Sequence, residues 1–425
     1  MASQAAGSGT AGGNRVLIAI AGVIMQLALG AVYGWSVFRK PLSEAYGVEV
    51  SPVNLAFTIT IFTLGFAAFA GGIWMGRVGP RTVAITSGVL YGLGIFLTSF
   101  ADNSLTLLYL TYGVIAGAGI GLGYIVPIAT LVKWFPDKRG VITGIAVAGF
   151  GGGAILAAQI APRLIESVGL FPTFAVLGIA YLIVVVGAGL FMKNPPAGYK
   201  PPGFQPDTSG SSERSAVDYE FGAAVKTWQW YALWALLFLN VTAGISIIAE
   251  AAPMTEEITG AGTAAAAALV SIIAIFNGIG RFLWAALSDA IGRKWVFFTM
   301  FVIQAVLFVL MPIIGTSYFV FTTLACIILL CYGGGFGTMP AFTADYFGSA
   351  NVGRIYGLLL TAWSFAAVVG PLLISYVHDS TGSYGPAFYI IAGIMAASAV
   401  IALIIRPPKA PEGAGAGSRA SEARA

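Results

Sequence analysis

One charged residue within an apolar stretch suggests a chemical function before any other feature does. Arg281 lies near the middle of the run from Ser271 to Asp289. A charge at the centre of a membrane-spanning helix costs at least ~3 kcal/mol on insertion scales. Guanidinium keeps its proton at any working pH, so the residue must face a cavity or a partner. We therefore interpret Arg281 as a binding site for an anion, since no acid lies within one helical turn of it.

The position of Arg281 fits this interpretation. It precedes Asp289 by eight residues, which at 1.5 Å per residue places it about 12 Å into the membrane if Asp289 lies at one face. Guanidinium binds a carboxylate through two parallel hydrogen bonds. Asn277 lies one turn earlier on the same helix face, where its amide can orient Arg281, bond a substrate hydroxyl or bond a neighbouring helix. Tyr33 offers a further hydroxyl and an apolar ring face.

Three titratable residues are candidates for proton coupling. Glu250 lies near the end of an apolar run, three residues before Pro253, where the helix can break. Burial would raise the pKa of such a carboxyl group towards neutrality. His378 and Asp379 end a later run. The alternative is that all three are solvated charges at helix ends.

The sequence offers few residues for enzyme or metal chemistry. Cys326 and Cys331 share one apolar run, which favours neither a disulfide nor a metal pair, and His378 is the single histidine. Glycines cluster at 117–123 and 149–153, but without a preceding strand they indicate close helix packing rather than a phosphate-binding loop. We expect no cofactor, no resident metal and no enzymatic activity.

Composition defines the elements that must position these residues. Hydrophobic residues make up 58% of the 425 and charged residues 9%, where soluble domains carry about 25% charged residues. This indicates an integral membrane protein. Apolar runs long enough to span a bilayer recur twelve times, and they must be helices because helices satisfy their own backbone in lipid. The expected spans are 16–38, 52–75, 82–100, 105–132, 141–162, 170–192, 228–252, 264–288, 294–313, 318–342, 355–377 and 385–405.

One polar segment divides these spans into two sets of six. The segment 193–226 is rich in proline and serine and is predicted to be a linker. We therefore expect an all-α fold of two six-helix bundles, at 15–192 and 227–406. The ends 1–14 and 407–425 are predicted to be disordered tails.

The distribution of basic residues predicts the orientation. If the N-terminus is inside, 17 of the 21 Lys and Arg residues lie on the inner side. Three lie outside, and Arg281 lies within the membrane. The positive-inside rule then places both termini and the linker in the cytoplasm, so we expect a multi-pass protein of the cell membrane. The modest basic excess is accounted for by this orientation, and we expect no nucleic-acid partner.

The two halves carry related motifs at the end of their second helix. The first half reads GGIWMGRVGPR and the second reads ALSDAIGRK. Gly76 of the first half stands at the place that Asp289 holds in the second, where the signature of the family that these motifs resemble carries an acid. These motifs and the six-plus-six arrangement resemble the major facilitator superfamily. Further similarity lies in YGWSVF (33–38), KWFPDKRGVITG (133–144) and CYGGGFGTMP (331–340), which together resemble its oxalate/formate antiporter and monocarboxylate transporter branch.

The resemblance implies carboxylate transport by alternating access, with spans one, four, seven and ten lining the cavity. It favours Tyr124, Tyr332 and Phe336 as substrate contacts, with Leu29 and Trp363 as apolar walls. The gating residues would be Asp289, Arg293, Asp137 and Arg354, with Lys138, between helix ends at the inner face. Trp363 occupies the place of the second cation of oxalate exchangers, and Asn277 that of an aspartate in animal monocarboxylate carriers.

These observations lead to one functional hypothesis and its alternatives. We predict a monomeric carrier of small monocarboxylates such as lactate and pyruvate, coupled to proton symport. The alternative within the same branch is a carboxylate exchanger of the oxalate/formate type. A channel would not require the duplicated motifs, and a receptor or structural role does not account for a buried arginine.

Overall fold

Among the residues that the structure describes, twelve helical spans are long and apolar enough to cross a membrane, as the sequence predicts. The structure is a computed structural model, and it describes residues 8–196, 198–201 and 218–409. Within these residues every regular element is a helix. The observed spans agree with the predicted ones to within a few residues at most ends. This agreement is expected, because the thickness of the bilayer sets the length of each apolar run.

The first bundle contains α1 to α8. Its first span runs through α1, a 3-10 segment η1 and α2, and its fourth span runs through α5, the π-helical segment η2 and α6. The bounds are α1 Ser8–Gly30, η1 Ala31–Trp35, α2 Ser36–Tyr46, α3 Val50–Val78, α4 Pro80–Thr98, α5 Leu105–Leu108, η2 Tyr109–Ala116, α6 Gly117–Trp134, α7 Arg139–Val168 and α8 Leu170–Gly189.

The second bundle contains α10 to α16, preceded by the short helix α9. Its fifth span is formed by α14 and α15 together. The bounds are α9 Phe221–Ala224, α10 Trp228–Thr259, α11 Thr263–Ile291, α12 Arg293–Ile314, α13 Tyr318–Phe347, α14 Val352–Leu359, α15 Thr361–Thr381 and α16 Gly385–Ile404.

Two details differ from the sequence predictions. The first helix begins at Ser8, so residues 8–14 belong to it and not to a disordered tail. The helix α10 continues through Pro253 to Thr259 without the expected break. Residues 1–7, residues 197 and 202–217 of the predicted linker, and the C-terminal tail from residue 410 lie outside the described residues.

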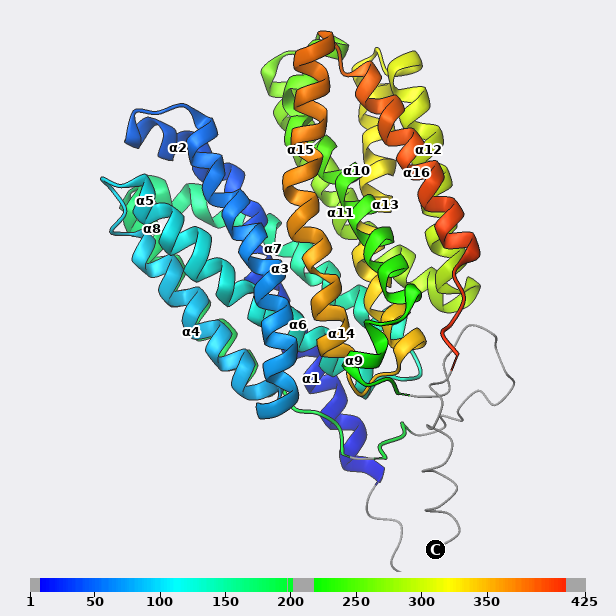
Figure 1. The fold of residues 1–425 in the computed structure, drawn as a ribbon. Coiled ribbons are helices and arrows are strands. Elements are labelled where there is room, and N and C mark those ends of the chain that lie inside the picture. The colour runs from blue at the N-terminus through cyan, green and yellow to red at the C-terminus, as the bar shows by residue number, and fades with distance from the viewer. Residues whose placement is uncertain (1–7, 197, 202–217, 410–425) are drawn as a thin grey trace, which may run out of the picture.

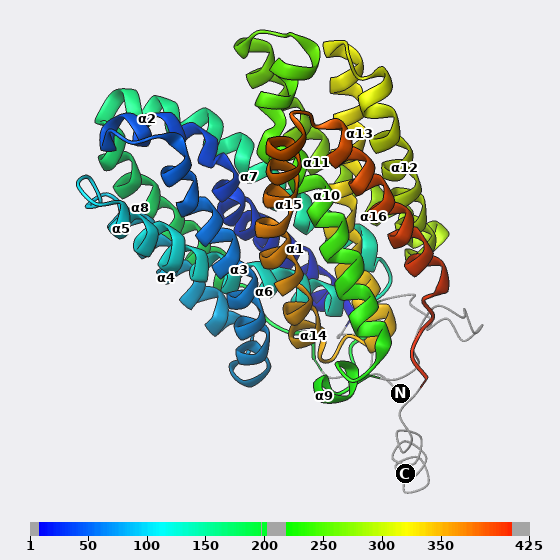
Figure 2. The ribbon, with the colours of Figure 1, turned by 45° about the horizontal axis from the view of Figure 1, so that its top comes forward.

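The two bundles meet at one end of the molecule and diverge towards the other. In Figures 1 and 2 the blue-to-cyan first bundle and the green-to-red second bundle converge near α9 and α14, where α1 begins and α16 ends. Contacts between the bundles are made by α7 with α11 and by α3 with α14 and α15. A site at this interface is therefore built from both halves of the chain.

Glycines allow the helices to approach closely beside the interface. A Cβ atom at Gly30 would lie 1.7 Å from the backbone oxygen of Phe150, and one at Gly153 would lie 2.2 Å from that of Leu27. The end of α1 therefore rests directly on α7. The 3-10 turn η1 follows at once and contains Tyr33. Close packing of α1 on α7 thus determines where the Tyr33 side chain begins.

Candidate functional site

The guanidinium of Arg281 lies at the interface between the bundles and is 0% exposed. Its Nε donates to Asn277 Oδ1 at 3.4 Å, one turn earlier on α11. Its Nη1 donates to the backbone oxygen of Val147, on α7 of the first bundle, also at 3.4 Å. Its Nη2 has no hydrogen-bond partner among the described residues. Arg281 is therefore enclosed by protein groups and does not reach the outer surface of the molecule.

The titratable groups closest to the Arg281 guanidinium are phenols, which are neutral near pH 7. They are the side chains of Tyr33, Tyr124 and Tyr332, and within the described chain no carboxylate is among them. A buried cation without a counter-ion carries a large desolvation cost, which a bound anion would offset. The charge at this site is therefore compatible with an anionic ligand and is not balanced by the described protein groups.

Aromatic rings surround the guanidinium. Its central carbon lies 5.0 Å from the ring centroid of Phe336, 5.7 Å from that of Tyr33 and 5.8 Å from that of Phe150. These distances lie within the range for cation–π attraction. Phe150, on α7, was not among the residues that the sequence suggested. It lies within AGFGGG, residues 148–153. The glycines of this segment indicate helix packing, and nothing in the local sequence indicates that its one aromatic residue faces a binding site.

Trp363 joins these rings into one cluster. Its ring centroid lies 4.7 Å from that of Phe336, 5.7 Å from that of Tyr124 and 6.2 Å from that of Tyr33. Leu29 lies beside this cluster, since a Cβ atom at Gly123 would come within 2.8 Å of its Cδ1. The structure thus brings the predicted aromatic residues together around Arg281, whereas no described contact joins Leu29 to the guanidinium.

The unpaired polar groups of this cluster share one chemical property. Six buried donors make no hydrogen bond of normal geometry with the described residues: the hydroxyls of Tyr33, Tyr124, Tyr332 and Tyr356, the Trp363 indole nitrogen and Arg281 Nη2. Some of them lie close to one another, with Tyr33 near Arg281 and Tyr332, and Tyr124 near Tyr356. All of them can donate a hydrogen bond. A buried donor left unpaired costs about 1–3 kcal/mol. An ionised carboxylate accepts hydrogen bonds and donates none, so it is the kind of ligand that this set of groups would stabilise.

A cavity leads from the diverging end of the bundles towards this cluster. It encloses about 360 Å³ and is lined by both halves of the chain. Tyr33, Asn277 and Tyr332 line it, and Arg281 lies directly behind them. Tyr124, Phe336, Trp363 and Leu29 do not line it in this conformation. A ligand must therefore displace a side chain, such as that of Tyr33, to reach the guanidinium.

The three candidates for proton coupling occupy different surroundings. Glu250 lines the cavity and accepts hydrogen bonds from Ser375 and Tyr384, both at 3.3 Å. Burial and the neighbouring Glu250 raise the pKa of Tyr384, so its hydroxyl stays protonated and donates to the carboxylate. His378 and Asp379 lie outside the cavity lining, and His378 pairs with Glu257 at 2.8 Å.

Glu250 faces a basic residue of the other bundle. Arg39, on α2, lines the same cavity and interacts electrostatically with Glu250. Arg39 is one of the three basic residues that the sequence places on the outer side, and the sequence suggests no further role for it. Of the three candidates, Glu250 is therefore the one placed on the route between the diverging end and Arg281.

At the converging end, charged residues join the two bundles. Asp289, on α11, accepts from the backbone nitrogens of Gly140 at 3.0 Å and Val141 at 2.9 Å, at the start of α7. Arg293 binds Asp289 at 2.5 Å and Asp345 at 2.9 Å. We call Asp289, Arg293, Asp345 and Arg139 the closed-end network. It places a carboxylate at the N-terminus of α7, where the helix dipole stabilises negative charge.

Two other predicted gating residues, Asp137 and Lys138, form no ion pair between the bundles in the described structure. Asp137 pairs with Arg15 at 3.2 Å, and because both belong to the first bundle this pair does not join the two halves. Lys138 is exposed. Arg139 and Asp345, which form a cross-bundle ion pair at 2.9 Å, were not predicted as gating residues. Their positions in the sequence, 206 residues apart, gave no sign that they meet.

Comparisons with known proteins agree with this architecture. The model of the Major Facilitator Superfamily matches residues 16–255 and 233–424. The chain is 31% identical to the MFS-type transporter YhjX of Escherichia coli strain K12, over 84% of this chain and 86% of that protein. It is 28% identical to the oxalate:formate antiporter of Oxalobacter formigenes, over 89% of this chain and 88% of that protein.

Monocarboxylate transporters are also among the relatives. Human monocarboxylate transporter 10 is 27% identical, over 74% of this chain and 62% of that protein. The crystal structure of the transporter FucP in the outward conformation matches with a TM-score of 0.69 at 15% identity, over 92% of this chain and 99% of that chain. The relatives include named members of the branch that the sequence motifs resemble, and the chain belongs to the major facilitator superfamily, a family of membrane transporters.

Proposed function

We propose that this transporter carries small monocarboxylates of the lactate and pyruvate type. The observation that carries the proposal is the set of buried, unpaired donors around Arg281, in a site without a carboxylate partner among the described residues. One guanidinium neutralises one carboxylate, and the phenols supply further hydrogen bonds. The ring faces of Tyr33, Phe150 and Phe336 suit a short carbon chain.

The relatives support the same class of substrate. The names of two of them specify oxalate and formate, and monocarboxylates. Small organic carboxylates are common to both. The cavity of about 360 Å³ falls at the lower end of the range typical of small-molecule sites.

The arrangement of the two ends supports transport by alternating access. The cavity reaches the site from the diverging end, while the closed-end network joins the bundles on the other side. Carriers of this architecture hold substrate near the membrane centre and rock one half against the other. The excess of basic residues at the converging end supports the proposal that it faces the cytoplasm, in the cell membrane.

Proton symport is the coupling we propose. An anion that enters alone against a negative-inside potential meets about 2.3 kcal/mol per 100 mV. Entry of one proton with each monocarboxylate removes that electrical work. Glu250 is the proposed proton carrier, because it lies on the cavity wall. Its carboxylate accepts hydrogen bonds from the hydroxyls of Ser375 and Tyr384, which can reorient when it takes up a proton.

Uptake of labelled lactate into proteoliposomes tests this function. An inward proton gradient should raise the uptake, and Arg281→Ala should abolish it. Arg77→Ala is the matched control, since Arg77 is an exposed cation on α3 that does not line the cavity. Lactate uptake by Arg281→Ala at the rate of the unaltered protein would contradict the assignment of the site.

A carboxylate exchanger is the second candidate, favoured by the similarity to an oxalate:formate antiporter. Trp363, a fully buried aromatic residue, argues against a second cation for a dianion at its position. Uptake that does not change with the proton gradient, but rises when the vesicles are preloaded with a carboxylate, would favour exchange. Stronger competition by oxalate than by pyruvate against labelled lactate would support a dianion substrate.

A further inference from the structure

The ends of α3 and α11 share one backbone feature and differ in one residue that bears on charge. Each helix stops at a glycine with positive φ, at 82° for Gly79 and 91° for Gly292. Three residues before those glycines stand Gly76 in the first bundle and Asp289 in the second. Both helix ends also lie against the start of a helix in the opposite bundle. The two halves therefore differ in that only one has a carboxylate at this place.

In the second bundle the carboxylate of Asp289 has a clear structural role. It accepts two backbone hydrogen bonds at the start of α7 and an ion pair from Arg293. At the equivalent place the Arg354 guanidinium lies over Gly76, since a Cβ atom there would be 2.5 Å from its Nη2 and 2.6 Å from its Nε. Arg354 thus occupies the position of a partner to a carboxylate that the sequence does not supply.

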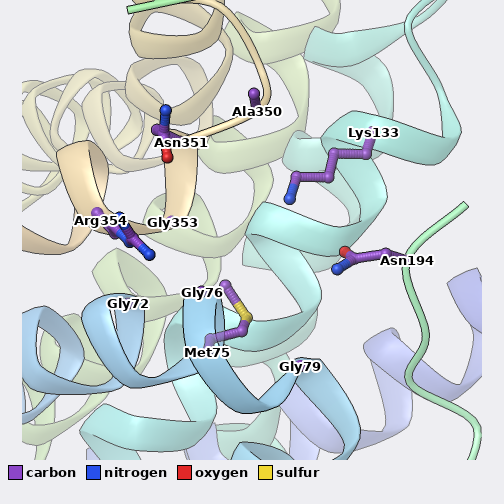
Figure 3. Close-up of a pocket in the computed structure, with 10 residues that line it drawn as sticks. All are labelled: Gly72, Met75, Gly76, Gly79, Lys133, Asn194, Ala350, Asn351, Gly353 and Arg354. Carbon is purple, nitrogen blue, oxygen red and sulfur yellow. The ribbon is translucent and has the colours of Figure 1, made fainter. Parts of the chain in front are cut away.

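A pocket of about 190 Å³ lies at this position, and Figure 3 shows the residues that line it. Lys133 of α6, Asn194 and Arg354 point towards the same space between α3, α6 and α14. The lining contains two cations, two amides and the glycines of α3, and no acidic residue lines it among the part of the chain that is described. The nearby Asp218 accepts a hydrogen bond from the backbone nitrogen of Ala350, and its charge acts on Lys133 from outside the pocket lining.

The two cations belong to different halves of the transporter. Lys133 ends the fourth span of the first bundle, and Arg354 begins the fifth span of the second. Neither forms an ion pair or a side-chain hydrogen bond with the described residues. An anion between them would join the bundles as Asp289 does at the equivalent place, at the end that is closed in this conformation.

We propose that this pocket binds an oxyanion of the phosphate class, which replaces the missing carboxylate and helps to hold the converging end closed. Phosphate presents several acceptor oxygens, which suit one guanidinium, one ammonium and two amides. The ligand is either free phosphate or the headgroup of an anionic phospholipid, since the chemistry recognised is the same. This site lies apart from Arg281 and does not depend on the proposed substrate.

Thermal unfolding of the purified full-length protein in detergent tests the proposal. Sodium phosphate, compared with sodium chloride at equal ionic strength, should raise the Tm by about 1–3 °C for a ligand that binds the folded state. Gly76→Asp supplies the missing carboxylate, and a flexible side chain is all that its Cβ would displace. This variant should have a higher Tm without phosphate and should lose the response to it.

Two further variants separate the site from general effects of salt. Arg354→Gln should lose the phosphate response, whereas Arg77→Gln, which removes an exposed cation of α3 outside the pocket lining, should keep it. If Arg354→Gln fails to fold, Gly76→Asp still decides the question. An equal phosphate response in Gly76→Asp and in the unaltered protein would overturn the proposal.

The source of the anion is tested with lipid bilayer discs. Phosphatidylglycerol, compared with phosphatidylcholine, should raise the Tm of the unaltered protein but not that of Gly76→Asp if a lipid headgroup binds. A response to phosphate in detergent but not to phosphatidylglycerol assigns the site to the free ion. The proposal is wrong if neither phosphate nor phosphatidylglycerol stabilises the unaltered protein more than Gly76→Asp.

Discussion

The guanidinium carbon of Arg281 lies 5.7 Å from the ring centroid of Tyr33, and the two residues belong to different bundles. The cation comes from α11 and the ring from the turn η1 at the end of α1. Movement of one bundle against the other must therefore change this contact. The contacts of a ligand held between the two residues would therefore change when one end of the transporter closes and the other opens.

Arg281→Lys tests whether the shape of the guanidinium matters as well as its charge. Lysine keeps the charge but lacks the planar fork that binds a carboxylate through two hydrogen bonds. Loss of one charge-assisted bond of about 1.5–3 kcal/mol predicts a KM for lactate roughly 10- to 150-fold higher. Kinetics of labelled uptake would measure it, with Arg163→Lys at an exposed position as control. An unchanged KM would argue against two-point binding.

Tyr33→Phe removes one unpaired hydroxyl and keeps the ring that packs on Phe150 and Trp363. If the hydroxyl bonds the substrate, its loss should raise the KM by about 2- to 12-fold, from 0.5–1.5 kcal/mol per neutral hydrogen bond. The Tm should change little, because the ring is kept and the hydroxyl makes no hydrogen bond of normal geometry in the structure. Tyr231→Phe is the control, at an exposed position on α10. A lower Tm with an unchanged KM would show a purely structural role.

Asp289→Asn should weaken the closed-end network. The amide loses the ion pair with Arg293 and retains a single acceptor atom for the two backbone nitrogens. We expect the converging end to open more often. The readout is labelling of Ala344→Cys, a position 1% exposed beside this network, in a background where Cys326 and Cys331 are replaced. Labelling by a membrane-impermeant thiol reagent should become several-fold faster.

The control for this experiment is Asp137→Asn. Asp137 pairs with Arg15 inside the first bundle, so its loss should leave the labelling rate of Ala344→Cys unchanged. Equal acceleration by both substitutions would mean that general destabilisation, and not the cross-bundle bonds, controls access at this end.

The sequence predicts the spans well, because hydrocarbon thickness determines the length of each apolar run and the lipid excludes other backbone structures. It also identifies Arg281, since a charge at that depth has few explanations. It does not reveal the pairing of Arg139 with Asp345 or the contact of Phe150 with Arg281. Both depend on which faces of distant helices meet, and a helix that is apolar on all sides carries little information about its facing direction.

Glu250→Gln tests the coupling mechanism. For one proton per monocarboxylate, each pH unit of gradient can drive an approximately tenfold accumulation of lactate. If Glu250 carries the proton, the glutamine variant should lose this accumulation, because its amide cannot take up and release a proton. It should still exchange labelled for unlabelled lactate, since Arg281 and the aromatic cluster are unchanged.

The matched control for Glu250→Gln is Glu257→Gln, on the same helix. Glu257 pairs with His378 and does not line the cavity, so its substitution should preserve accumulation. Lactate and pyruvate accumulation in proteoliposomes, measured with and without a proton gradient, separates the two variants. Accumulation by Glu250→Gln equal to that of the unaltered protein would exclude Glu250 as the proton carrier. Loss in Glu257→Gln alone would instead assign proton coupling to the pair with His378.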